Sequence, residues 1–404
     1  MRRAIVPALG LLLITTAACA PRATRASTDG PDAAARLRWR QQVMTDSVRA
    51  VLARGLADSA YPAAWAVIGT ADGIYTSLGV GRVESLDTTW LPVTDSTLWD
   101  LASLTKVVGT TSAVLQLVAE GRVELDAPAT KYLPRWRAAR AEEVTIRHLL
   151  SHSAGLPAWR PLYKEAWSAE EAIAQVYATG PDTTPGRRYV YSDLGFILLG
   201  EVVREVSGLP LDSYLLSRVF LPADMRETRY LPSALWRSRT APTEFDPWRQ
   251  RHVRGEVHDE NAFQLGQVSG HAGLFSSARD LTRFAQLLLR GGWVRTADST
   301  RREILPSSTL RDFRQRQPLG EGLRALGWET PTGVNSAGQR LSDEAFGHTG
   351  FTGTSLWVDP GRDVFVLLLT NRVNPTRQRT GIGRVRPELA DAVVGALEAT
   401  AGQR

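Results

Sequence analysis

Apolar residues recur at strand spacing near both ends of the chain and at helix spacing between them. Two strands are predicted over Ala63–Thr70 and Ile74–Val83, which Ala71-Asp72-Gly73 joins. An Asp-Gly turn between two apolar runs is typical of a β-hairpin. Towards the other end, the same pattern predicts strands over Ala325–Glu329, Phe346–Thr349, Thr354–Val358 and Val364–Thr370.

Helical periodicity predicts helices through residues 37–52, 103–120, 145–151, 169–177, 193–206, 211–220, 279–290 and 387–400. Residues 230–262 are rich in Pro, Arg and Trp without periodicity, so a long surface excursion near a site is expected there. The predicted fold class is therefore α+β. An antiparallel sheet from residues 60–85 and 325–370 is flanked by helices and carries an inserted all-helical lobe over about residues 120–265. A cleft between sheet and lobe is the expected place for a site.

The N-terminus has the layout of an export signal. A basic start precedes a short apolar run, Ala4–Ile14, and residues 1–19 are predicted to be a signal peptide. Cys19, the only cysteine, ends this signal and is predicted to be lipidated, with an ordinary cleavage at Ala18-Cys19-Ala20 as the alternative. Residues 20–32 are a predicted flexible tether and residues 33–404 the folded domain. The protein is expected in the periplasm or cell envelope, anchored to the membrane if Cys19 is acylated.

The charge of the chain and its distribution indicate which classes of binding partner are expected. The net charge is +6, and 43% of the 404 residues are hydrophobic, enough for a large core. The basic residues are mostly arginines scattered along the chain rather than gathered on one arm, so no nucleic-acid partner is expected. The positive charge is compatible with substrates that carry a carboxylate.

The first candidate for chemistry is Ser103-Leu104-Thr105-Lys106, at the start of a predicted helix. Residues three apart on a helix are neighbours, so Lys106 can reach the Ser103 hydroxyl. A lysine with a lowered pKa can take the proton of a serine and make it nucleophilic. Lys106 is one of only three lysines in a chain that otherwise uses arginine, which stays protonated. The alternative is that Ser103 caps the helix and Lys106 is a solvated surface residue.

Two further segments carry candidate site residues. Tyr191-Ser192-Asp193 opens a helix after a Pro-Gly turn, where a tyrosine hydroxyl can relay a proton; a packed aromatic beside an N-cap is the alternative. His348-Thr349-Gly350-Phe351-Thr352-Gly353 lies on a predicted strand, where glycine lets a ligand approach the backbone; a Gly-rich bulge is the alternative.

Together these segments resemble the penicillin-recognising serine hydrolases: class C β-lactamases, DD-peptidases and related esterases. That family carries S-x-x-K, Y-x-N and K-T-G or H-T-G in this order, and the chain has Ser103-Lys106, Tyr191-Asp193 and His348-Thr349-Gly350. Residues 148–156 and 270–275 are also similar to the family. The resemblance covers roughly residues 40–400 and implies a sheet flanked by helices, a helical lobe and a cleft between them.

The resemblance also implies roles for single residues. Ser103 is the expected nucleophile, Lys106 its base and Tyr191 a partner in proton transfer. The backbone N–H groups of Ser103 and Phe351 are expected to form the oxyanion hole, and the remaining expected substrate-binding residues are His348, Thr349, Gly350 and Asp193. No cofactor and no metal are expected.

Two departures from the family pattern bear on the substrate. Asp193 stands where the family usually has Asn; its anion disfavours an acidic substrate group there and can hold Lys106 protonated. His348 replaces the Lys common in β-lactamases, as in some DD-peptidases and esterases, so β-lactam hydrolysis is not the leading activity. His258-Asp259, within a Gly-Glu-Val-His-Asp segment, is interpreted as a surface loop in preference to a site segment.

The predicted function is a serine hydrolase that forms an acyl-enzyme on Ser103. Its partner would be a small-molecule or peptide acyl substrate, first a D-Ala-D-Ala peptide as for a carboxypeptidase, or else an ester. The alternatives are a β-lactamase and a non-catalytic module that binds peptidoglycan or penicillin.

Overall fold

The computed structural model describes residues 31–84, 89–296, 300–322, 324–333 and 335–401. Contacts divide the chain into two units, Met1–Trp39 and Arg40–Arg404, and the account below concerns the second unit. The helix α1, Pro31–Ala57, begins in the first unit and ends in the second. The predicted signal peptide, Cys19 and nearly all of the predicted tether lie outside the described residues.

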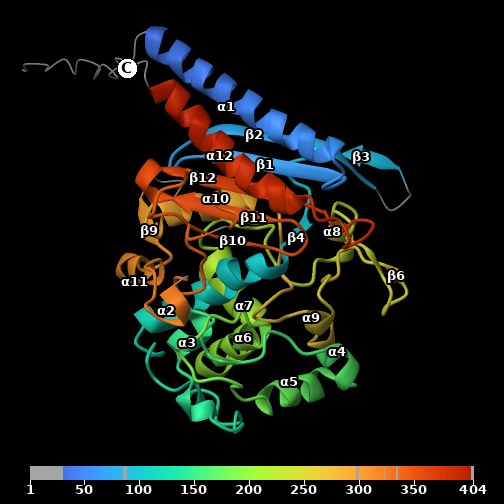
Figure 1. The fold of residues 1–404 in the computed structure, drawn as a ribbon, viewed down its shortest axis with the longest axis vertical. Helices are drawn as coiled ribbons and strands as arrows, with labels where there is room; N and C mark the ends of the chain where they lie inside the picture. The colour runs from blue at the N-terminus through green and yellow to red at the C-terminus, as the bar shows by residue number, and fades with distance from the viewer. Residues whose placement is uncertain (1–30, 85–88, 297–299, 323, 334, 402–404) are drawn as a thin grey trace, which may run out of the picture. The chain divides into compact units, whose positions relative to one another are not determined.

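A six-stranded antiparallel sheet is the centre of the second unit (Figure 1). Its strand order is β10-β11-β12-β1-β2-β3, so strands from both ends of the chain meet where β12 pairs with β1. The strands are β1 (Ala63–Gly69), β2 (Ile74–Glu84), β3 (Trp90–Pro92), β10 (Phe346–Thr349), β11 (Ser355–Asp359) and β12 (Val364–Thr370). The prediction of an antiparallel sheet built from both ends of the chain is confirmed.

Successive side chains of the central strands point to opposite faces of the sheet, so each face has its own part of the hydrophobic core. Ala64, Ala66 and Ile68 of β1 pack with buried side chains of α1 and of α12, Ile382–Ala401. Val67, one residue out of phase, belongs to the larger cluster on the other face, which includes the apolar stripe of α10 and the helices beyond it. Figure 1 shows α12 and the C-terminal part of α1 above the sheet and helices α2 to α7 below it.

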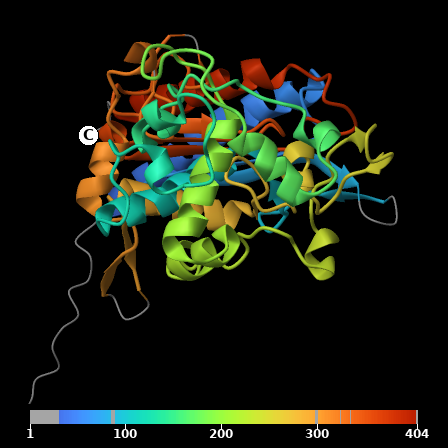
Figure 2. The ribbon, with the colours of Figure 1, turned by 90° about the horizontal axis from the view of Figure 1, so that it is seen from below.

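The remaining helices and short strands lie between β3 and β10 in sequence. The elements are β4 (Trp99–Asp100), α2 (Ser112–Ala119), α3 (Ile146–Leu150), α4 (Leu162–Glu165), α5 (Ala169–Tyr177), α6 (Asp193–Ser207), α7 (Leu211–Leu215), α8 (Ala234–Arg237), β5 (Phe245–Asp246), β6 (Arg251–His252), α9 (Glu260–Gln264), β7 (Phe275–Ser276), α10 (Ala278–Leu289), β8 (Trp293–Arg295), β9 (Arg301–Glu303) and α11 (Ser307–Phe313). Viewed from below, helices α3 to α7 lie in front of the sheet (Figure 2). The predicted excursion over 230–262 contains α8, the β5–β6 hairpin and the start of α9.

The segment predicted as one helix over residues 103–120 changes helix type along its length. A 3₁₀ turn, Ala102–Leu104, is followed by a π-helical stretch, Lys106–Thr111, and then by α2. π-helical turns widen a helix and are frequent at functional sites. The segment Ala102–Ala119 is long and apolar enough to cross a membrane by composition, but 83% of it is buried inside the fold. It is therefore the core helix of this unit.

The strand predicted over Ala325–Glu329 is wrong. Only isolated bridges form there, between Arg324 and Glu329 and between Glu329 and Gly347. Gly327 has a φ of +84°, and its N–H donates to the Leu150 carbonyl at 2.8 Å. A residue with positive φ reverses the chain, so the apolar run forms a tight turn whose backbone bonds go to neighbouring elements.

Candidate active site

Ser103 lies on a strained turn that leads from β4 into the core helix. Ala102, directly before it, has a φ of +45°, a conformation that side-chain-bearing residues rarely adopt. The Asp100 carboxylate accepts the Ala102 N–H at 2.8 Å and holds this turn. Strain of this kind persists only where the surroundings enforce it, and it is common at functional sites. The turn leaves the Ser103 side chain partly exposed between buried neighbours.

Lys106 is fully buried beneath Ser103 and has three acceptors. Its Nζ donates to Ser103 Oγ at 2.9 Å and to the His271 carbonyl at 3.2 Å, and it forms an ion pair with Asp193 Oδ1 at 2.8 Å. An ammonium group has three N–H donors, so this set of acceptors fits the charged form. Burial acts to lower the pKa of Lys106, but the Asp193 carboxylate and Tyr191 outweigh it and raise that pKa above its ordinary value.

Asp193 reaches Lys106 from the first residue of α6. Ser192 caps this helix by accepting the Gly195 N–H at 3.3 Å, and an anion at a helix N-terminus is favourably placed. The Asp193 N–H donates to the Ala158 carbonyl at 2.9 Å, which fixes the start of the helix. The expectation that an aspartate at this position holds Lys106 protonated agrees with the raised pKa of Lys106.

Tyr191 completes the wall beside Lys106. Its ring centroid is 4.8 Å from Lys106 Nζ and 4.4 Å from the ring of His152, whose Nδ1 accepts the Ser192 N–H at 3.1 Å. Burial raises the pKa of Tyr191, and Lys106 and Ser103 lower it only in part. The phenol is therefore a proton donor at neutral pH. Its buried hydroxyl makes no well-aligned hydrogen bond to any described residue.

The strand side of the site consists of β10 and the turn after it. His348 is 1% exposed, and its Nδ1 lies 2.8 Å from the Thr349 carbonyl. Burial, reinforced by the charges of Arg324 and Lys106, holds the pKa of His348 well below its ordinary value. The imidazole is thus neutral, and its single proton lies on Nδ1, which faces the Thr349 carbonyl. Nε2 is therefore an acceptor and offers a substrate carboxylate neither a hydrogen bond nor a positive charge. Thr349 is partly buried.

Gly350 and Phe351 bring this turn against the nucleophile segment. A Cβ on Gly350 would collide with the Leu101 carbonyl and the Thr354 hydroxyl, so only glycine fits. The Thr352 hydroxyl donates to the Asp100 carbonyl at 2.7 Å. Within the described part of the chain, the N–H groups of Ser103 and Phe351 donate no backbone hydrogen bond. Both donors are thus available for the oxyanion hole that the sequence predicts.

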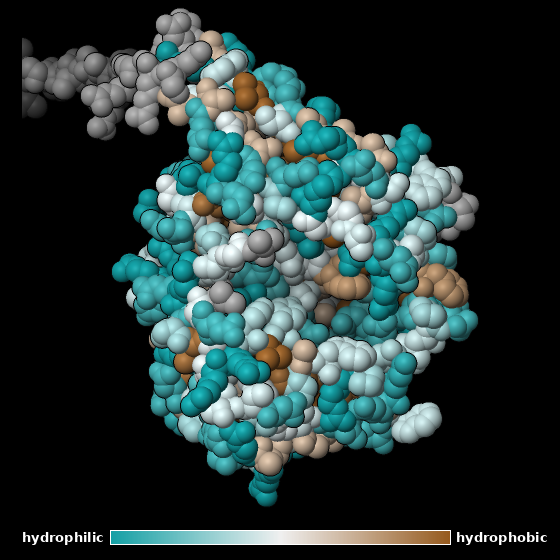
Figure 3. All heavy atoms as spheres, viewed as in Figure 1, coloured by the Kyte–Doolittle hydropathy of each residue, from teal (hydrophilic) through white to brown (hydrophobic). Residues whose placement is uncertain are grey.

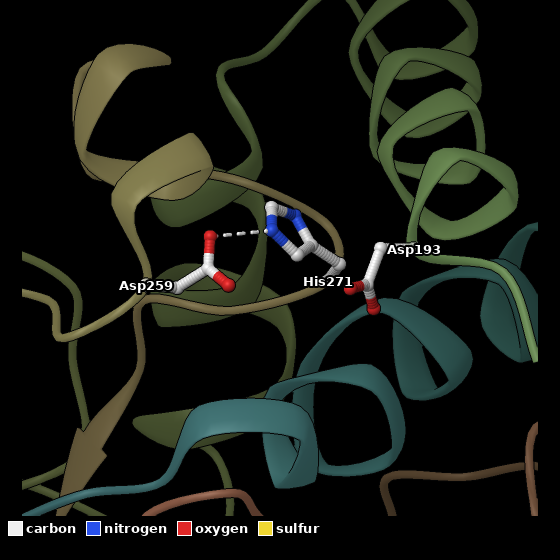
Figure 4. A group of neighbouring side chains, drawn as sticks. All are labelled: Asp193, Asp259 and His271. Carbon is white, nitrogen blue, oxygen red and sulfur yellow. Dashed lines mark hydrogen bonds and ion pairs between the residues drawn. The ribbon is translucent and has the colours of Figure 1, made fainter. Parts of the chain in front are cut away.

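Asp193, Asp259 and His271 form the cluster of side chains best placed to hold a metal ion among the described residues. One ligand atom from each lies within 4.8 Å of the other two, and Figure 4 shows His271 between the two carboxylates. Spacing along the chain does not indicate the third ligand, because Asp193 comes from α6, far from the other two residues in sequence. Lys106 already supplies a cation to Asp193, and His271 Nε2 lies 3.0 Å from Asp259 Oδ1. The three side chains therefore already have partners in this arrangement: Asp193 pairs with Lys106, and His271 contacts Asp259.

The β-lactamase family matches residues 48–390 of the chain. The chain belongs to the β-lactamase family. A "Putative D-alanyl-D-alanine carboxypeptidase" of Salmonella schwarzengrund (strain CVM19633) is 30% identical over 312 residues, which cover 69% of this chain and 70% of that protein. Membership of this family makes the chain a hydrolase related to β-lactamases.

Solved structures agree with this β-lactamase-family assignment at the level of the fold. EstCE1, a hydrolase with promiscuous acyltransferase activity, superposes with a TM-score of 0.69 at 20% identity, covering 88% of this chain and 99% of that one. A penicillin-binding protein homologue from Caulobacter crescentus gives a TM-score of 0.69 at 20% identity, covering 88% and 97%. The predicted fold of an antiparallel sheet flanked by helices is confirmed.

The structure also places residues at this β-lactamase-family site that the sequence did not. His258 and Asp259, interpreted as a surface loop, lie against the nucleophile segment and against His271. His271 contributes its backbone carbonyl to Lys106, a contact that no side-chain motif signals. The buried imidazole of His271 has both ring nitrogens occupied, one by Ser269 Oγ and the other by Asp259 Oδ1.

Proposed function

We propose that this protein is an exported serine hydrolase of the cell envelope that forms an acyl-enzyme on Ser103, with peptides ending in D-Ala-D-Ala as its first substrate class. The observation that carries the proposal is the 2.9 Å contact between Ser103 Oγ and Lys106 Nζ on a strained turn. The name of the Salmonella relative supports the substrate class. Export and a lipid anchor at Cys19 rest on the sequence of residues 1–32.

In the proposed reaction, neutral Lys106 takes the proton of Ser103 while Oγ attacks the substrate carbonyl. The oxyanion accepts hydrogen bonds from the N–H groups of Ser103 and Phe351. Tyr191 relays the proton from Lys106 to the leaving group. Water then attacks the acyl group, which leaves as a carboxylic acid while a proton returns to Ser103 Oγ. Lys106 must lose a proton before it can act as the base. The reactive fraction of the enzyme therefore rises with pH.

Ester hydrolysis is the second candidate function, and two observations favour it. The Asp193 carboxylate lies beside the nucleophile, and the imidazole of His348 is neutral. Neither group attracts a substrate carboxylate electrostatically, whereas a neutral ester meets no repulsion. The fold shared with EstCE1 is consistent with acyl transfer of this kind.

Covalent labelling tests the proposed function. A fluorophosphonate and, separately, benzylpenicillin are incubated with the purified protein, and intact mass and peptide mapping locate any adduct. We expect a single fluorophosphonate adduct on Ser103. Accumulation of a penicillin adduct favours the D-Ala-D-Ala carboxypeptidase. Turnover of penicillin indicates a β-lactamase. Hydrolysis of an ester without any penicillin adduct favours the esterase. A folded protein that binds peptidoglycan fragments but takes no label contradicts the proposal and identifies the non-catalytic module.

Replacing Asp193 with Asn, the usual family residue, is expected to shift the pH dependence. Asp193 raises the pKa of Lys106, so its removal is expected to lower that pKa. The active form carries neutral Lys106, so the rising limb of kcat/KM moves to lower pH and activity at neutral pH increases roughly tenfold or more. Ester hydrolysis from about pH 6 to 10 measures the shift, with Asp212→Asn at the start of α7 as control. An unchanged or upward-shifted limb would mean that Asp193 does not hold the proton on Lys106.

A further inference from the structure

His258 is a buried residue that contacts the nucleophile segment through its backbone. It is 4% exposed, although it comes from the long excursion between α7 and α9. Its N–H donates to Asp100 Oδ2 at 2.6 Å, and the other oxygen of the same carboxylate accepts the Ala102 N–H at 2.8 Å. One carboxylate therefore fixes His258 relative to the strained residue that precedes Ser103.

The imidazole of His258 contacts the other half of the candidate oxyanion hole. It stacks on the ring of Phe351, with centroids 5.7 Å apart and an interplanar angle of 22°. The opposite constraint on Phe351 comes from Arg372, whose Nε donates to the Phe351 carbonyl at 2.8 Å and whose guanidinium lies 4.4 Å from the ring centroid. The Arg377 guanidinium also lies 5.9 Å from the ring centroid, and the Phe351 side chain is otherwise half exposed, at 49%.

Glu244 sets the orientation of the His258 ring. Glu244 Oε1 lies 2.6 Å from His258 Nε2, and Oε2 accepts the Arg377 N–H at 2.8 Å. The Arg377 side chain pairs with both Glu244 and Glu260. Glu244 is 3% exposed, and burying such charges is costly unless they are paired. The short contact of this buried carboxylate with Nε2 fixes the plane of the His258 ring that stacks on Phe351.

We propose that His258, oriented by Glu244, is a positioning residue that fixes the distance between the two N–H donors of the oxyanion hole. It holds the Ser103 donor through Asp100 and the Phe351 donor through its ring. This inference rests on the proposed function of Ser103. It assigns a role to a segment whose sequence reads as a surface loop.

Two variants and one matched control test the inference. His258→Gln keeps a donor for Glu244 but has no ring to stack on Phe351, and Glu244→Gln keeps the shape but removes the charge. His252→Gln makes the same change at an exposed residue of the same excursion. For His258→Gln we expect kcat for an ester to fall roughly tenfold to a hundredfold with little change in KM, because the loss is confined to the transition state. Glu244→Gln is expected to act in the same direction, and His252→Gln to match the wild type.

Two further readouts separate positioning from general stability. The inhibition constant of a boronic acid, whose Ser103 adduct places an anionic oxygen in the hole, should rise by the same factor as kcat falls. Hydrogen exchange of residues 350–354 should accelerate in His258→Gln and not in the control. Equal changes in KM and kcat, or unchanged exchange of this segment, would overturn the inference. If the wild type takes no fluorophosphonate, the proposed function fails, but the exchange measurement still decides whether His258 positions Phe351.

Discussion

Replacing Ser103 with Ala is expected to abolish hydrolysis of every substrate that the wild-type protein turns over. The hydroxyl of Ser103 is the group that Lys106 contacts at 2.9 Å, and alanine offers no atom that can form the acyl bond. Loss of a serine nucleophile lowers kcat by about 10³-fold or more, leaving only the contribution of binding and of the oxyanion hole. Ester and peptide hydrolysis, followed together with intact mass after fluorophosphonate treatment, measure the effect.

Ser238→Ala is the matched control, since Ser238 is exposed at the end of α8. It should retain wild-type rates and the adduct. The Ser103→Ala protein should unfold at nearly the wild-type temperature, because the side chain is only partly buried. Hydrolysis that persists in Ser103→Ala, with the adduct intact, would move the nucleophile to another residue and remove the basis of the proposed mechanism.

The sheet could be predicted because its sequence signals are local. Alternation in β1 and β2, with the Asp72-Gly73 turn between them, predicts a hairpin, and the register of Ala66 with Leu78 confirms it. The pairing of β1 with β12 is not local. The sequence predicts only that strands from both ends of the chain share one sheet, and the fold decides that β1 and β12 are the strands that pair.

The failed strand at Ala325–Glu329 shows where a short apolar run is ambiguous. Periodicity cannot distinguish a strand from a buried turn over five residues. The positive φ of Gly327 and the burial of Arg324 opposite Glu329 decide the structure, and both depend on tertiary contacts. The π-helical stretch after Ser103 escaped prediction for the same reason, since its residues read as an ordinary helix.

The candidate site likewise contains residues that the sequence predicts and residues that it does not. Ser103, Lys106, Tyr191 and His348 lie in short motifs, and the structure brings these segments together. The His271 carbonyl was missed because any residue can supply a backbone acceptor. His258 and Asp259 were discounted because their partners, Asp100 and His271, become neighbours only in the fold. Side-chain chemistry was therefore predictable where it was local, and the contacts that position it were not.

Replacing Lys106 with Arg is expected to reduce kcat by about 10²- to 10⁴-fold, the range for loss of a general base. Arginine keeps the positive charge and can still pair with Asp193, but its guanidinium does not give up a proton at accessible pH. Lys106→Met removes the charge as well, and should be equally inactive if proton acceptance is what the reaction requires. Steady-state ester hydrolysis and the rate of fluorophosphonate labelling measure both variants.

The comparison between the two variants distinguishes a base from a structural cation. If Lys106 served only to neutralise Asp193, Arg would restore activity that Met loses, because only Met leaves the carboxylate unpaired. Lys131→Arg, at an exposed site, controls for the exchange itself. Lys106 is fully buried, so the unfolding temperature of each variant shows whether the larger guanidinium fits. Recovery of wild-type rates in a folded Lys106→Arg protein would assign the base to Tyr191, whose hydroxyl is the remaining proton carrier beside Ser103.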